Sequence, residues 1–128
     1  MPLLAYLESS VTGVSPKGNT PVIAFNHQSA PGDNQVFVIR KKIDASTDAF
    51  HTKMNEEAVF DKWKLDLWHL PRSGPECVYV TITLEKAKIA WINMVMPDAQ
   101  MPEFLNIHEY EDIAFEFEKS TYTTKNKD

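Results

Sequence analysis

The chain has 128 residues, enough for one domain with a hydrophobic core, and we expect a single domain over 1–128. Its 43% hydrophobic and 24% charged residues are typical of a folded globular protein and argue against a disordered chain. The net charge is −5 and the basic residues are scattered, which argues against a nucleic-acid-binding protein.

The start of the chain and its cysteine content bear on where the protein works. Residues 1–10 lack a basic region and hold only a short apolar run, so the sequence predicts no signal peptide. No apolar run reaches the roughly 18 residues of a membrane-spanning helix, so we expect no membrane insertion. Cys77 is the only cysteine, which excludes an internal disulfide and favours folding in a reducing compartment. We therefore expect a cytoplasmic protein that, if secreted, leaves without a signal peptide.

Apolar residues alternate with polar residues along most of the chain, a pattern that predicts β-strands buried on one face. The expected strands span residues 3–9, 21–28, 35–43, 61–69, 78–84 and 111–119. Loops rich in proline, glycine and asparagine separate them. The sequence thus predicts a mainly β fold.

The strand expected at 61–69 contains an unusual outer face. Its inward residues are Trp63, Leu65 and Leu67. Its outward residues are Lys62, Lys64, Asp66 and Trp68. A large aromatic side chain among charges is typical of a protein contact surface, and tryptophan is enriched at interface hot spots. We interpret these four outward residues as a candidate subunit interface or lumen surface.

One segment, 46–57, has a helical rather than a strand pattern. Its apolar residues recur every four positions at Phe50, Met54 and Ala58. Ser46 or Thr47 is expected to cap the first N–H groups of this helix. We expect the apolar stripe to close one end or flank of the β structure.

Residues that could carry chemistry are present but are not arranged as a site. The histidines are His27, His51, His69 and His108. No two of them have the spacing of paired metal ligands, so we assign them no role. Cys77 follows Glu76, the wrong electrostatic setting for an activated thiol.

Paired carboxylates and tryptophans have structural interpretations too. Glu56–Glu57, Glu109–Glu111 and Glu116–Glu118 are interpreted as solvated or interface charges rather than as an acid and base pair. Trp63 and Trp91 are in phase with inward apolar residues, which predicts core positions. Without a catalytic motif, the sequence predicts no enzyme and no cofactor.

Three segments, taken in order and spacing, resemble the haemolysin-coregulated protein (Hcp) family of type VI secretion systems. They are the strand 36–39 that leads through 44–46 into the helix, the stretch 81–89, and the closing stretch 111–119. The resemblance implies an antiparallel two-sheet β-barrel of six to eight strands with one short α-helix. It also implies hexameric rings that stack as the inner tube of a contractile apparatus, carry small effectors in the lumen, and leave the cell when the apparatus fires. The implied partners are sheath, spike and effector proteins.

The sequence departs from the family between its early strands. Family members have a longer segment there, with a loop that reaches the neighbouring ring, whereas only 26–34 lies between the strands here. Ring formation can survive this shortening, whereas the short segment argues against the stacking of rings into a tube. Residues 123–128 are expected to form a polar tail, with no fused toxin domain.

A different class of function remains open at this point, namely a small-ligand-binding β-barrel. Such a protein needs an internal cavity. The large inward residues expected from the alternation, Phe115 and Phe117 together with Trp63 and Trp91, argue that the interior is filled.

Overall fold

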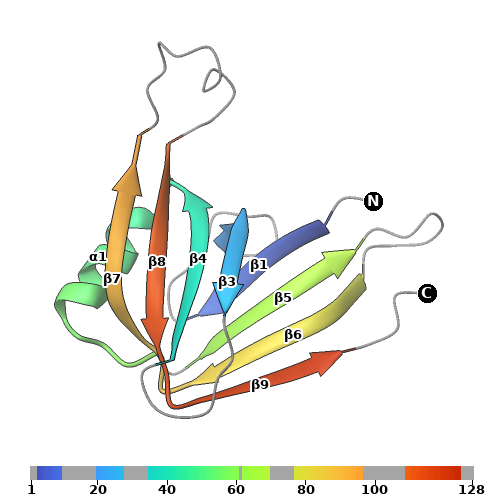
Figure 1. Ribbon diagram of the computed structural model, residues 1–128. Helices are drawn as coiled ribbons and strands as arrows, with labels where there is room; N and C mark the ends of the chain where they lie inside the picture. Colours follow the sequence, from blue (N-terminus) through green and yellow to red (C-terminus); the bar gives the residue numbers. More distant parts are fainter. Residues whose placement is uncertain are drawn as a thin grey trace.

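The computed structural model describes residues 3–9, 20–27, 35–60, 62–69, 77–96 and 109–124, which form one helix and nine strands in two antiparallel sheets (Figure 1). In chain order the elements are β1 (Leu3–Ser9), β2 (Thr20–Val22), β3 (Ala24–His27), β4 (Val36–Lys42), α1 (Thr47–Asn55), β5 (Trp63–His69), β6 (Cys77–Glu85), β7 (Lys88–Val95), β8 (Tyr110–Glu116) and β9 (Lys119–Thr124). One sheet has the strand order β2-β1-β5-β6-β9 and the other β3-β4-β8-β7. Within the described ranges, α1 is too short and too polar to cross a membrane.

The chain passes between the sheets through the helix α1, from β4 to β5, and at three short corners. Ile23 alone separates β2 from β3, Lys86 and Ala87 separate β6 from β7, and Phe117 and Glu118 separate β8 from β9. Lys86 has a φ of 55°, a left-handed conformation that turns the chain at this corner. The amide of Glu118 donates to the carbonyl of Glu85 over 3.0 Å, which joins two of the three short corners.

These crossings correct two expectations about the strands and one about the architecture. The strand expected at 21–28 is two short strands in different sheets, and the strand expected at 111–119 divides in the same way. The two sheets stay open instead of closing into the expected barrel, because strands that bend at corners build a two-sheet packing (Figure 1). The mainly β fold with one helix is confirmed.

The core lies between the sheets and follows the predicted alternation. Fully buried inward residues include Leu7, Phe37, Ile39, Leu65, Ile113 and Phe115. The ring of Trp63 packs edge-on against Phe37 and Phe115 at centroid distances of 5.0 and 5.3 Å. These contacts fill the space in which a ligand-binding barrel would hold its cavity.

Trp91 is not a core residue, contrary to the expectation. The register between β7 and β8 shifts between Ile89 and Trp91, so an extra residue, Ala90, bulges from β7. A bulge changes the face on which the following side chains lie. Ile89 is buried, whereas Trp91 lies opposite Ala114 on the outer face and is 46% exposed.

Helix α1 lies beside β7 at one flank of the four-stranded sheet (Figure 1). It is shorter than the expected 46–57, and its stripe buries Phe50 while Met54 packs at the edge of the core. Ser46 is the N-cap residue but makes no capping bond, because its hydroxyl donates to Asp44 over 2.6 Å. At the other end of the molecule β9 includes Thr123 and Thr124, so part of the expected polar tail is strand, and 125–128 lies outside the described residues.

Candidate functional site

The candidate interface residues lie on the outer face of the five-stranded sheet, at and just before β5. We call Lys62, Lys64, Asp66 and Trp68 the β5 face. Lys62 is exposed and forms an ion pair with Glu8 of β1. Lys64 is half-buried and lies between Glu8 on β1 and Thr83 on β6.

Asp66 occupies the outer face as predicted, yet it is only 7% exposed. It lies between Tyr6 of β1 and Thr81 of β6, and the Thr81 hydroxyl donates to its Oδ1 over 2.8 Å. Cross-strand neighbours therefore cover a carboxylate that alternation alone predicts to be solvated. The sequence placed the residue on the correct face but not its degree of burial.

Trp68 is half-buried and lies next to an irregularity of the sheet. The register between β5 and β6 shifts between Leu67 and Trp68, so Leu67 lies opposite Val80 whereas Trp68 lies opposite Val78. Bulges bend and twist a strand locally and re-aim its side chains. The extra residue, Tyr79, lies on β6, while β5 keeps its regular pairing with β1 through Leu4 and Trp68.

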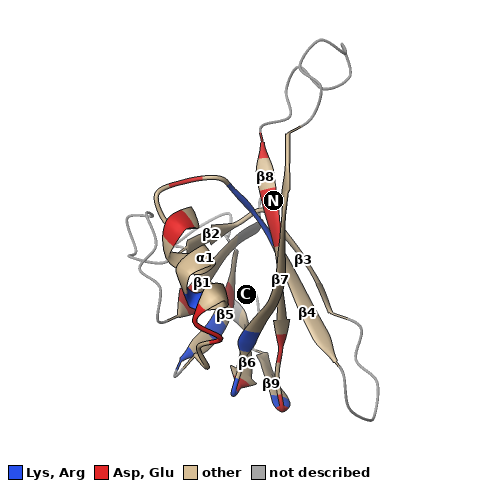
Figure 2. Ribbon diagram, turned by 90° about the vertical axis from the view of Figure 1, so that its left-hand side faces the viewer, with Lys and Arg blue, Asp and Glu red and all other residues tan. Residues whose placement is uncertain are grey.

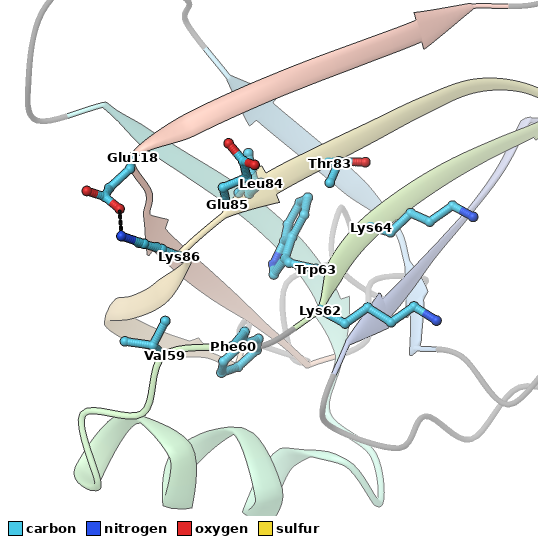
Figure 3. A pocket seen from close by; sticks show the side chains of 10 residues that line it. All are labelled: Val59, Phe60, Lys62, Trp63, Lys64, Thr83, Leu84, Glu85, Lys86 and Glu118. Carbon is cyan, nitrogen blue, oxygen red and sulfur yellow. Dashed lines mark ion pairs between the residues drawn. The ribbon is translucent and has the colours of Figure 1, made fainter.

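A pocket of about 770 Å³ adjoins the β5 face (Figure 3). Its lining combines apolar side chains with lysines and glutamates: Val59, Phe60, Lys62, Trp63, Lys64, Thr83, Leu84, Glu85, Lys86 and Glu118. Lys62 and Lys64 belong to both features, so the pocket is continuous with the β5 face.

A buried ion pair that the sequence analysis missed joins β4, β8 and the start of α1. Lys41 and Glu111 are fully buried cross-strand partners, and Lys41 Nζ lies 2.7 Å from Glu111 Oε2. The Thr47 hydroxyl donates to the same oxygen over 2.6 Å, and Lys41 Nζ also donates to Asp44 over 3.0 Å. In Figure 2 the basic end of β4 lies beside the acidic start of β8.

Glu111 was expected to be a solvated or interface charge, which is wrong. Its phase with Ile113 and Phe115 is the signal that could have placed it inside, as is the phase of Lys41 with Phe37 and Ile39. Glu116 and Glu118, in contrast, are exposed as predicted.

The histidines do not form a site in the described part of the chain. His27 Nδ1 bonds with the hydroxyl of Tyr122, and His51 Nε2 lies 3.7 Å from Glu111 Oε1. Among the described residues, no group of three or more histidine, cysteine, aspartate or glutamate side chains could hold a metal ion. The side chains of His69 and Cys77, and the whole of His108, lie outside the described residues.

Comparison with known proteins gives one family and many solved structures. The model of a family described as "Type VI secretion system effector, Hcp" matches residues 9–123. No curated protein matches the chain.

The solved structures share the fold at low sequence identity. Secreted protein Hcp3 from Pseudomonas aeruginosa is 20% identical with a TM-score of 0.77, and the match covers 96% of this chain and 91% of that one. Hcp1 from E. coli EAEC 042, as a double mutant, is 20% identical with a TM-score of 0.76 over 98% and 93% of the two chains. Hcp1 from Salmonella typhimurium is 11% identical with a TM-score of 0.81 over 98% and 88%.

Proposed function

Because the chain belongs to the Hcp family and is a subunit of the type VI secretion tube, we propose that it assembles as a closed hexameric ring through the β5 face. The observation that carries this proposal is the family match over 9–123, which spans both sheets and the helix. The role is structural rather than catalytic, and it needs no cofactor.

The β5 face has the composition of a contact surface. Its tryptophan is the residue type most enriched at interface hot spots, and Lys62 and Lys64 give it a charged rim. In a ring, every subunit presents two different surfaces to its two neighbours, so a heterologous partner surface covers Trp68. Asp66 is held by Thr81 and Lys62 by Glu8 within the subunit, so the apolar surface of Trp68 is the part of the β5 face that the neighbour is proposed to cover.

Assembly into rings implies further protein partners and a route of secretion. Rings stack in the cytoplasm inside a sheath, meet a spike protein at the tip, and carry small effectors in their lumen. Secretion follows from firing of the apparatus rather than from cleavage of a signal peptide. Stacking was expected to depend on the length of the segment 26–34, of which residues 28–34 lie outside the described residues.

Light scattering coupled to size-exclusion chromatography tests the ring. We expect a mass about six times the 14.6 kDa of the chain at micromolar concentration. A strictly monomeric protein at the highest concentrations that remain soluble would overturn the proposal.

Intact-mass measurement on culture supernatant tests the route. We expect the secreted form to keep its N-terminus, with loss of at most Met1. A secreted form that has lost its N-terminal segment would show cleavage and contradict this part of the proposal.

A further inference from the structure

The two oxygens of the buried Glu111 carboxylate have unequal surroundings. Oε2 lies 2.7 Å from Lys41 Nζ and accepts from the Thr47 hydroxyl over 2.6 Å. Oε1 is buried as well, yet it accepts no hydrogen bond from any residue of the described ranges. Buried carboxylate oxygens are ordinarily hydrogen-bonded, because otherwise their loss of hydration is not compensated. One side of Glu111 is therefore open to a further donor.

Helix α1 brings a second unsatisfied atom to this oxygen. His51 lies one turn after Thr47 on the same face of the helix, so both side chains reach Glu111. His51 Nε2 is 3.7 Å from Glu111 Oε1, and it too is buried without a hydrogen-bond partner in the described part of the molecule. This distance is too long for a hydrogen bond. A small rotation of the imidazole ring closes the gap, after which α1 holds both oxygens of one carboxylate.

The charges around this gap favour a positively charged imidazole. Lys41 contributes one positive charge, whereas Asp44 and Glu111 contribute one negative charge each, so one negative charge is left over. An imidazolium at His51 brings the cluster to neutrality and pairs the Oε1 side of Glu111, as buried charges require. The side chain of His51 is 35% exposed, so a proton can reach it from the solvent.

Within the described residues, the neighbouring elements add no competing positive charge next to this gap. Met94, on the strand that packs against α1, is the residue opposite Glu111, and it is uncharged. Glu109 is exposed just before β8 and in phase with Glu111, so it adds a negative charge. Asp48 and Lys53, on α1 itself, have opposite signs. The other charged or titratable residues on β4, β7 and β8 lie on the outer face of the sheet or at its far end: Arg40, Lys42, Lys88, Tyr110, Asp112 and Glu116. A proton on the imidazole therefore acts mainly on the buried cluster.

We propose that His51 is a pH-sensitive switch in the attachment of α1 to the four-stranded sheet. The imidazolium donates from Nε2 to Glu111 Oε1, while Thr47 holds Oε2. When the imidazole loses its proton, this bond loses its charge and α1 is held to Glu111 mainly by Thr47. Because the bond exists only in the folded protein, protonation favours the folded state, so the stabilisation is present in acid and is lost as the pH rises. The switch belongs to the single subunit and does not depend on the ring.

Urea unfolding of the full chain tests the switch by comparing the wild-type protein with His51→Gln from about pH 8 to about pH 5.5. Glutamine can place an amide N–H near the position of Nε2, so the variant keeps a donor but cannot become charged. The equilibrium constant for unfolding of the variant, relative to that of the wild type, should rise about three- to tenfold toward acid, the effect of charging one hydrogen bond. Groups that titrate in both proteins cancel in this ratio. A ratio that stays constant overturns the proposal.

Hydrogen exchange of the wild-type protein supplies a readout that does not require the variant to fold. Protection of the α1 amides, corrected for the intrinsic effect of pH on exchange, should rise about three- to tenfold over the same range. Lys53→Gln is the matched control, because it removes a charge from the same helix but leaves His51 and Glu111 in place, so the rise should remain. Protection that does not change with pH, or a rise that disappears in Lys53→Gln, overturns the proposal.

Discussion

Lys41 and Glu111 form an ion pair in which each buried charge needs the other. Two ionised groups removed from water are tolerated only when they are paired and hydrogen-bonded. Here Thr47 adds a hydroxyl donor from the first residue of α1, so the pair also attaches the helix to β4 and β8. The attachment therefore depends on both charges being present.

Removal of one partner should be much worse than removal of both. Glu111→Leu alone leaves Lys41 buried with Asp44 as its remaining carboxylate partner, and we expect it to lower the free energy of unfolding by about 3–5 kcal/mol. The double variant Lys41→Met with Glu111→Leu should recover most of that loss. Urea unfolding measures all three proteins, and equal losses for the single and double variants would contradict the coupling.

Asp44 makes stability depend on pH. Partial burial raises the pKa of Asp44, but hydrogen bonds from Ser46 and Lys41 and the charge of Lys41 outweigh it, so the pKa lies below its ordinary value of 3.8. A carboxyl group with a lowered pKa stabilises the fold above its ordinary pKa, and this contribution disappears as the pH falls.

The test compares the wild-type protein with Asp44→Asn. The difference in unfolding free energy should be largest near about pH 6 and should shrink toward about pH 3, as Asp44 becomes protonated. Lys42→Gln provides a control with a changed charge but no bond to Asp44. A difference that stays constant over this range would show that the Asp44 charge is not used.

At the scale of elements, helix α1 ends at a residue type that is unfavourable for the backbone conformation found there. The amide of Glu57 donates to the Met54 carbonyl and that of Ala58 to the Lys53 carbonyl, which is a Schellman motif. Glu57 has a φ of 53°, a conformation that glycine adopts without cost.

Glu57→Gly should therefore raise the free energy of unfolding, by about 1 kcal/mol. Glu56→Gly is the matched control, because Glu56 has a right-handed conformation with φ −80°. There glycine should lower stability by about 0.5–1 kcal/mol through its greater freedom in the unfolded chain. Urea unfolding that shows the same sign for both variants would contradict the assignment.

The contact of α1 with the core rests on Phe50, which is fully buried and lies 6.5 Å from the ring of Phe60. Phe50→Ala should cost about 3–5 kcal/mol, because it leaves a cavity under the helix. Urea unfolding tests this too, with Asp48→Ala as an exposed control on the same helix. A loss below about 1 kcal/mol would mean that the helix face was assigned wrongly.

The sequence predicted elements better than it predicted their irregularities. Alternation placed Trp63, Leu65 and Phe115 inside correctly, since a regular strand has a strict period of two. It wrongly placed Trp91 in the core, because the bulge at Ala90 inserts one residue and no residue type nearby indicates a bulge. It also failed at Ile23, where a strand changes sheets within one residue.

The candidate site shows the same limit. Lys64, Asp66 and Trp68 could be assigned to one face from spacing alone. The burial of Asp66 depends on neighbours from β1 and β6, and the pocket depends on where β5 leaves β6. Such long-range pairings are not encoded in any local stretch of the sequence.

At the scale of the whole molecule, assembly and folding should respond separately to one substitution. Trp68 is half-buried outside the core cluster, so Trp68→Asp should keep the fold, while the new charge in a desolvated contact disrupts the ring. Circular dichroism should be unchanged, and native mass spectrometry should shift from hexamer to monomer. Trp68→Phe should keep the hexamer. A hexamer that survives Trp68→Asp, or a variant that unfolds, would remove Trp68 from the interface.

The strands that cross between the sheets also have a mechanical consequence. Because covalent backbone passes through the corners at Ile23, Lys86 and Phe117, force applied to one sheet reaches the other without relying on side-chain packing alone. The two sheets cannot swing apart about a single flexible connection, since the corners at Glu85 and Glu118 are bonded to each other. We therefore expect the two sheets to move together as one rigid body when force acts on the subunit.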